Sequence, residues 1–211
     1  MVDDAITSDP LAHLDYFSEW GGRSWQRLLA YAFDSFIGSH LENQCVLDIG
    51  TRYGKMASLF AMLGARVVGI DINQDCLASA SREAEKWAVS RRTCFVAYDG
   101  NLDVLADQSF DLVFTKSVLV TVPRLADFLR QIDAKLKPGG RIVFLENGRG
   151  NAVVRALRRV RHRHWDFRRV TYFTPKEVNM ISEIFRLQAV RRTELPPVYL
   201  ILGTRRQGSS S

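Results

Sequence analysis

The sequence predicts an α/β protein whose mostly parallel sheet binds a nucleoside. The prediction rests on residues 45–71, where two apolar runs flank a glycine-containing turn and a helical pattern. The first run ends in Asp48 and the second in Asp71, which follows Gly50 by 21 residues. In doubly wound sheets such a turn brings backbone against a ligand, and an acid about 20 residues later binds ribose hydroxyls. We therefore expect Asp71 to bind a ribose.

Two helices are expected before this unit, over residues 9–40, with a break at Gly21-Gly22. The second helix carries an apolar stripe at helical spacing, which predicts packing against the sheet: Trp25, Leu28, Leu29, Ala32, Phe33 and Phe36. An alternative is that the aromatic entry segment covers the mouth of the ligand site through Tyr16, Phe17, Trp20 and Trp25.

The glycine turn indicates which nucleoside is bound. A dinucleotide fingerprint needs a central glycine so that the backbone can touch a pyrophosphate, but here Arg52 is central. S-adenosyl-L-methionine (SAM) has no pyrophosphate and needs close approach only at the first glycine. The turn resembles motif I of the class I SAM-dependent methyltransferases, D-x-G-x-G-x-G, in which Asp48, Gly50 and Gly54 match and Arg52 departs.

The resemblance continues in order through about residues 42–147. Tyr98-Asp99-Gly100 follows a predicted strand over residues 93–97, at the place of the family's acid near the adenine amino group. Residues 110–114 resemble its fourth strand, and residues 136–144 its L-K-P-G-G turn and fifth strand. The resemblance implies a Rossmann-like fold, with a seven-stranded, mostly parallel sheet and an antiparallel C-terminal hairpin.

SAM is the cofactor that the turn and the resemblance imply. In this reading Gly50 lies beside the methionine portion, Asp71 binds the ribose and Asp99 lies near the adenine. The expected cofactor-binding residues are Asp48, Gly50, Thr51, Arg52, Gly54, Asp71, Ile72, Asp99, Gly100 and Thr115.

The C-terminal part predicts a helix and the closing hairpin. Thr174-Pro175 with Glu177 is a strong helix start. Residues 185–192 and 199–204 suit the hairpin strands. The expected division of the chain is a helical cap (1–41), a SAM-binding core (42–147), a basic helix with the substrate-side and closing hairpin region (148–206), and a disordered tail (207–211).

The positive charge is concentrated in residues 149–169, which hold eight arginines and one acid. The net charge of this segment is +7 and that of the whole chain is +6, so the charges of the remaining residues sum to about −1. Four readings remain open: a solvated surface helix, a site for a small anionic substrate, a nucleic-acid contact and a contact with an anionic membrane. We rank a small anionic substrate first among the functional readings, with nucleic acid below it.

Methyl transfer requires in-line positioning, and removal of a proton when the acceptor is a hydroxyl. Ligands bind at the carboxyl ends of the strands in open α/β sheets, so the predicted catalytic residues are Lys116, Glu146 and His164. Each has a structural alternative: a salt bridge for Lys116, a hydrogen-bond acceptor role for Glu146 and a surface role for His164. No residues have the spacing of a metal site, and none is predicted.

The sequence thus predicts a methyltransferase that acts on an oxygen of a small anionic metabolite or glycan precursor. Alternatives are an RNA methyltransferase that uses the arginine-rich segment and a SAM-binding module without turnover. The three cysteines, Cys45, Cys76 and Cys94, are expected to be buried free thiols. With no apolar run of about 20 residues and no signal-peptide pattern, a cytoplasmic location is expected. The oligomeric state stays open.

Overall fold

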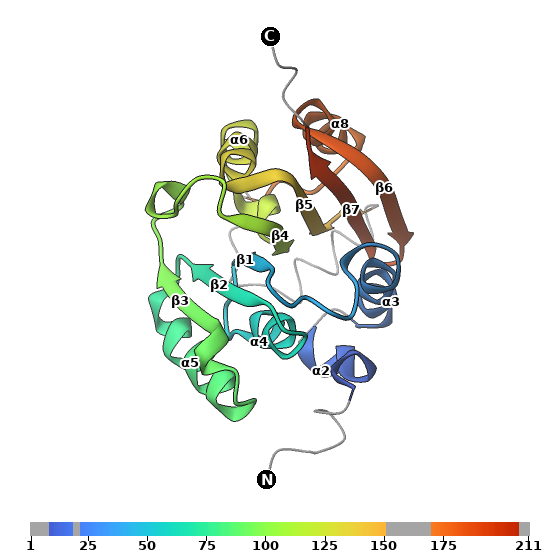
Figure 1. The fold of residues 1–211 in the computed structure, drawn as a ribbon. Helices are drawn as coiled ribbons and strands as arrows, with labels where there is room; N and C mark the ends of the chain where they lie inside the picture. The colour runs from blue at the N-terminus through green and yellow to red at the C-terminus, as the bar shows by residue number, and fades with distance from the viewer. Residues whose placement is uncertain (1–8, 19–21, 151–169, 207–211) are drawn as a thin grey trace.

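The computed structural model describes residues 9–18, 22–150 and 170–206. They form a twisted seven-stranded sheet with helices on both faces (Figure 1). The strands are β1 (Cys45–Ile49), β2 (Arg66–Asp71), β3 (Thr93–Ala97), β4 (Phe110–Lys116), β5 (Leu136–Asn147), β6 (Phe185–Glu194) and β7 (Pro197–Arg205). The α-helices are α2 (Leu14–Phe17), α3 (Gly22–Ala32), α4 (Lys55–Met62), α5 (Gln74–Lys86), α6 (Leu125–Lys135) and α8 (Pro175–Ile184). Short helical turns are η1 (Pro10–His13), η2 (Phe33–Ile37), η3 (Ser90–Arg92), η4 (Leu102–Val104) and η5 (Leu119–Thr121).

The strand order is β3-β2-β1-β4-β5-β7-β6. Strands β1 to β5 pair in parallel, and β7 pairs antiparallel with both β5 and β6. This confirms the predicted Rossmann-like, mostly parallel sheet with its C-terminal hairpin. The chain leaves β1 toward β2 on one side and later returns to β4 on the other. Such a switch point opens a crevice at the carboxyl ends of the strands, where ligands bind.

Two apolar cores lie on the two faces of the sheet. Helices α3, α4 and α5 cover one face, and α6 and α8 cover the other (Figure 1). Leu29 and Phe60 pack in the first core, and Phe128 and Ile132 in the second. Strands β1 and β4 contribute side chains to both cores, as expected for central strands buried on both faces.

The predicted stripe of α3 is buried as far as Phe33, but the helix then widens into the π-helical turn η2. The amide of Gly38 donates to the carbonyl of Phe33 at 2.9 Å, a bond that spans five residues. The wider turn shifts the helical register, so Ile37 is buried while Phe36, predicted to be in the stripe, is half-buried.

The C-terminal elements extend beyond their predicted bounds. The capping box at Thr174 and Glu177 is present, and both hairpin strands are longer than predicted. Strand β5 starts at Leu136, inside the predicted turn, because Leu136 already pairs with Phe110. Arg141 pairs next, with Leu112, so the intervening residues form a bulge.

All three cysteines are free, as predicted, but only Cys76 is buried. Cys94 is exposed and Cys45 is half-buried, because each lies near the start of a strand at the rim of the sheet. Within the described ranges, no helix has the length and apolar character needed to cross a bilayer.

Candidate cofactor site

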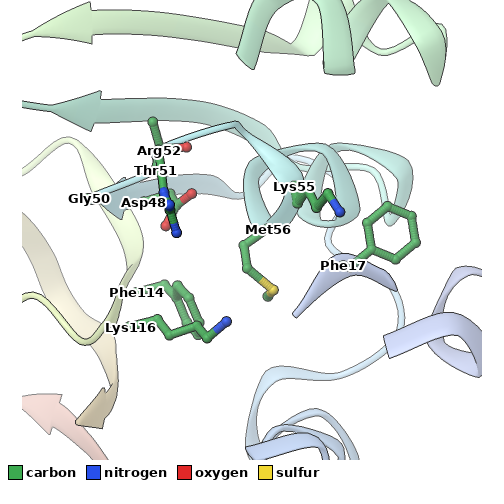
Figure 2. Close-up of a pocket in the computed structure, with 9 residues that line it drawn as sticks. All are labelled: Phe17, Asp48, Gly50, Thr51, Arg52, Lys55, Met56, Phe114 and Lys116. Carbon is green, nitrogen blue, oxygen red and sulfur yellow. The ribbon is translucent and has the colours of Figure 1, made fainter. Parts of the chain in front are cut away.

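Two adjoining pockets open at the carboxyl ends of β1, β2 and β4. The larger has a volume of about 560 Å³ and is lined by Gly50, Arg52, Asp71, Ile72, Asn73, Cys76, Tyr98, Asp99, Gly100, Lys116, Ser117, Val118, Thr121, Val122, Pro123 and Phe128. The smaller, of about 50 Å³, is lined by Phe17, Asp48, Gly50, Thr51, Arg52, Lys55, Met56, Phe114 and Lys116. In Figure 2, Met56 and Lys116 reach into the space between the β1 turn and Phe17. Gly50, Arg52 and Lys116 line both pockets and join them.

The turn after β1 is fixed by backbone hydrogen bonds to the end of β2. The amides of Gly50 and Thr51 both donate to the carbonyl of Ile70, at 2.8 and 3.0 Å. Gly50 has a φ of 74° and Arg52 a φ of 50°, so both residues are in the left-handed region. The turn therefore holds its backbone against the pockets in one defined shape.

Gly50 is also needed because of a side chain on the opposite wall. A Cβ added at Gly50 would lie 2.2 Å from Cγ2 of Val118, in the loop after β4. Real Cβ atoms do not approach another carbon so closely. The turn after β1 and the loop after β4 thus meet with no room for a side chain at position 50.

Asp71 ends β2 at the junction of the turn and the larger pocket. Its Oδ2 accepts from the amide of Arg52 at 2.8 Å, and its Oδ1 accepts from the amide of Asn73 at 2.9 Å. A carboxylate has about four acceptor sites, so each oxygen retains capacity for a further donor. A buried carboxylate held by two amides in a pocket wall fits the two hydroxyl donors of a ribose.

The far end of the larger pocket suits a flat heterocycle. Ile72 is 70% exposed, which is unusual for an isoleucine and leaves an apolar surface for a ligand. Burial, followed by the charge of Asp71, raises the pKa of Tyr98 to about 12. Tyr98 therefore stays protonated at neutral pH and serves as a hydrogen-bonding group rather than as a base.

Eight of the ten predicted cofactor-binding residues line the pockets: Asp48, Gly50, Thr51, Arg52, Asp71, Ile72, Asp99 and Gly100. Gly54 and Thr115 line neither. Gly54 caps α4, and a Cβ there would lie 2.8 Å from Cβ of Ala80, so it permits close packing of α4 on α5. Thr115 is fully buried, and its hydroxyl donates to Glu146.

Glu146, predicted to be catalytic, is fully buried and lines neither pocket. Its Oε1 accepts from the Thr115 hydroxyl at 2.9 Å and from the amides of Val118 and Leu119 at 3.2 and 3.1 Å. Its Oε2 accepts from the amide of Val120 at 3.4 Å. A base must reach the proton that it removes, so we infer a positioning role in place of the catalytic one. Glu146 holds the loop that carries Val118.

Burial raises the pKa of Glu146 to about 7 from its ordinary value of 4.5, against the opposing effect of its hydrogen bonds. The folded state thus binds this proton more tightly than the unfolded state, so the carboxyl destabilises the fold increasingly as the pH rises from 4.5 to about 7. Relative to Glu146→Gln, the wild-type free energy of unfolding should fall by up to about 3 kcal/mol over this range. Denaturant unfolding of both proteins at pH 5 and pH 8 measures the difference. An equal response to pH in the two proteins would contradict this assignment.

Lys116, at the end of β4, lines both pockets as predicted for a catalytic candidate. Its ammonium group donates to the backbone carbonyl of Ser18, and it lies 5.7 Å from the ring centroid of Trp25. Lys116 therefore connects the pocket to the N-terminal helices through a bond to backbone.

Only part of the aromatic entry segment is found to line the site among the residues that the structure describes. Phe17 lines the smaller pocket, whereas Trp25 is buried in the core and Tyr16 packs edge-on against Trp87. Three of the predicted features lie outside the described residues: Trp20, the catalytic candidate His164, and residues 151–169 of the arginine-rich segment.

Sequence reasoning missed most of the wall formed by the loop after β4 and the start of α6. This wall includes Val118, Thr121, Val122, Pro123 and Phe128. The available signal was topological: this loop follows the strand next to β1, and so must border the crevice at the switch point.

Residues 47–144 match a family model described as a methyltransferase domain. This stretch is a little under half of the chain, and the fold around it is similar to that of solved SAM-dependent methyltransferases. The cofactor implied by this family and fold is SAM, and the carboxylate, turn and apolar surface described above fit it.

Two curated methyltransferases are similar over the core. UbiE of Nitrobacter hamburgensis, a ubiquinone/menaquinone biosynthesis C-methyltransferase, is 39% identical over 101 residues, covering 47% of this chain and 38% of that protein. The ubiquinone biosynthesis O-methyltransferase of Albidiferax ferrireducens is 36% identical over 105 residues, covering 48% and 40%. The chain thus spans about two fifths of the length of these relatives.

Solved methyltransferases share the fold across most of the chain. A SAM-dependent methyltransferase from Methanosarcina mazei superposes with a TM-score of 0.68 at 23% identity, covering 81% of this chain and 96% of that one. The likeness in fold therefore extends well beyond the 98 residues of the matched domain.

Proposed function

We propose that this protein transfers the methyl group of SAM to a small-molecule acceptor. The observation that carries the proposal is the position of Asp71. Its carboxylate lies in the wall of a 560 Å³ pocket, hydrogen-bonded to the turn that starts at Gly50. At this one point the protein offers hydrogen-bond acceptors for the ribose hydroxyls and a backbone turn that can lie close to the cofactor.

SAM, when bound, supplies a methyl group already activated on a sulfonium. The chain then needs to orient the two reactants and accept a proton from a hydroxyl acceptor. The loop after β4, held by Glu146, forms the wall facing the turn. Lys116 lies at the junction of the two pockets. Its side chain would take this proton only as the neutral amine, because an ammonium group has no lone pair to accept it.

The acceptor that we propose is an oxygen on a small anionic metabolite or glycan precursor. The eight arginines of residues 149–169 support an anionic acceptor because guanidinium groups form paired hydrogen bonds with phosphate and carboxylate oxygens. The two curated relatives carry names for carbon and for oxygen methylation, so the acceptor atom is the part of the proposal that most needs a test.

The proposal is tested with SAM labelled on its methyl group. The protein is incubated with separate pools of phosphorylated metabolites, sugar nucleotides, quinol precursors and RNA. We expect label to enter a small-molecule pool. Label in RNA would support the nucleic-acid alternative, and SAM binding without transfer to any pool would support a non-catalytic module.

Arg155 and Arg159 test the proposed role of the arginine-rich segment. If the segment binds an anionic acceptor, changing both to glutamine should raise the Michaelis constant for that acceptor while SAM affinity stays within about twofold, because the cofactor is bound by other residues. Steady-state kinetics and calorimetry measure the two quantities. An unchanged Michaelis constant, with no loss of RNA or anionic-vesicle binding, would exclude each functional reading of the two arginines.

A further inference from the structure

Helix α3 lies beside the hairpin of β6 and β7, at the end of the sheet (Figure 1). It is joined to the hairpin at two points. The Ser24 hydroxyl donates to the carbonyl of Leu195, in the turn between the two strands, at 3.3 Å. Two helical turns later, the Tyr31 hydroxyl accepts from the guanidinium of Arg191 at 3.3 Å. The exposed side of α3 and the last residues of β6 therefore adjoin on one surface.

This surface carries exposed arginines. Arg23 and Arg27 are exposed on α3, and at four residues apart they project from the same side of the helix. Within residues 9–18, 22–150 and 170–206, neither guanidinium is hydrogen-bonded or ion-paired. Like charges at this spacing destabilise a helix, so the fold gains nothing from the pair. Arg191 is exposed on β6 and adds a third cation.

The acids of these elements do not cancel the positive charge. Together α3, η2 and β6 contain five arginines and two acids, Asp34 and Glu194. Glu194 lies next to the turn, and its carboxylate is 3.7 Å from the guanidinium of Arg192. That pair is neutral as a whole, which leaves Arg23, Arg27 and Arg191 to set the charge of the surface.

The turn between β6 and β7 forms an apolar tip beside these arginines. Leu195 is 71% exposed, and Pro196 after it is exposed as well. The Thr193 hydroxyl donates to the carbonyl of Pro196 at 2.6 Å and accepts from the amide of Val198 at 3.2 Å. These two bonds and the bond from Ser24 hold the turn in one shape, with the leucine side chain in solvent.

The tip lies at the edge of the sheet where the two pockets open. Asn147, at the carboxyl end of β5, pairs with Val198, so the turn before Val198 extends past the carboxyl ends of the parallel strands. The first turn of α3 connects the tip to the pockets. Its Trp25 ring centroid is 5.7 Å from the ammonium group of Lys116, which lines both of them. A partner on the tip would therefore lie at the same edge as the pockets.

We propose that this tip face, composed of Arg23, Arg27, Arg191 and Leu195, docks the protein on an anionic lipid bilayer. Such docking needs cations for the lipid phosphates and an apolar side chain that enters the boundary with the acyl chains. The tip face supplies both. RNA fits this surface less well, because bases stack on free aromatic or planar groups. The nearby ring of Tyr31 is covered by the Arg191 guanidinium, at 4.8 Å.

The test is co-sedimentation of the full chain with two kinds of vesicle, one of phosphatidylcholine and one of equal parts phosphatidylcholine and phosphatidylglycerol. We expect binding to the mixed vesicles, weakened by salt. Changing both Arg27 and Arg191 to glutamine should weaken it by roughly 30-fold, because each arginine near an anionic surface contributes about fivefold. Leu195→Ser should weaken it by about tenfold through lost apolar burial.

Two further variants keep the result interpretable. Changing Arg82 and Arg91 to glutamine removes the same charge from α5 and η3, beside β3 at the other end of the strand order. Binding should stay within about twofold, because charges beyond about 10 Å from the lipid are screened. Glu194→Gln removes an acid from the tip and should strengthen binding by about fivefold. Circular dichroism checks that each variant is folded.

The inference fails if the folded wild-type protein does not bind the mixed vesicles. It also fails if the Arg27 and Arg191 variant keeps its binding, which would assign the contact to other cations such as those of residues 149–169, or if the two double variants lose binding equally. RNA binding that these substitutions weaken, with vesicle binding unchanged, would replace lipid by nucleic acid as the partner. Each of these results leaves the proposed methyl transfer standing, because that is measured separately with labelled SAM.

Discussion

Replacing Gly50 with valine is expected to abolish cofactor binding. The new side chain would collide with Val118 where the two loops meet, since even its Cβ would lie 2.2 Å from Val118 Cγ2. The loop after β4 or the turn after β1 must then move, and both form walls of the site. We expect SAM affinity to fall by more than about 100-fold, or about 2.7 kcal/mol, by calorimetry.

The chain provides a matched control for backbone strain. Gly139 has a φ of 75°, almost equal to that of Gly50, but a Cβ there meets nothing within 4 Å. Gly139→Val should therefore share the conformational cost and leave SAM binding intact. Combining Gly50→Ala with Val118→Ala should restore part of the affinity lost in Gly50→Ala alone, because the nearest remaining atom, Val118 Cβ, is 3.6 Å away. Normal SAM binding by a folded Gly50→Val protein would contradict this account of the turn.

Replacing Asp71 with alanine should weaken SAM binding by about 1.5–3 kcal/mol, or roughly 10- to 150-fold. The substitution removes the acceptors for the ribose and also those for the amides of Arg52 and Asn73. Asp71→Asn keeps one carbonyl acceptor and should lose less. Asp75→Ala, an exposed acid on the adjacent first turn of α5, controls for long-range electrostatics. Affinity unchanged within twofold in Asp71→Ala would remove Asp71 from the site.

The features that the sequence predicted well are local. Asp48 and Asp71 each end a short apolar run, and the intervening glycines allow only a tight turn. Parallel pairing then brings the ends of β1 and β2 together, because Ile49 is in register with Ile70. The part of the cofactor wall formed by the ends of β1 and β2 follows from these constraints alone.

The features that the sequence did not predict depend on contacts between distant segments. Nothing near Glu146 in the sequence indicates that its carboxylate accepts bonds from residues 27 and 28 positions earlier. Gly54 was assigned to the ligand, but its close neighbour is Ala80 of α5. A glycine required by helix packing and a glycine required by a ligand look the same in one sequence.

Arg52 shows a different limit. The sequence marks it as a departure from the family motif and favours SAM over a dinucleotide for that reason. Only the structure places its side chain between the two pockets, with the Tyr53 ring beside it. The role of such a departure depends on where the side chain lies, which residue spacing does not specify.

The central claim is that the two adjoining pockets at the carboxyl ends of β1, β2 and β4 hold the cofactor. A crystal structure of the protein with S-adenosyl-L-homocysteine tests it most directly. The account predicts the adenosine in the larger pocket, both ribose hydroxyls within hydrogen-bond distance of Asp71, and the amino-acid end beside the turn at Gly50. Adenosine bound elsewhere, or an Asp71 carboxylate without contact to the ribose, would contradict it.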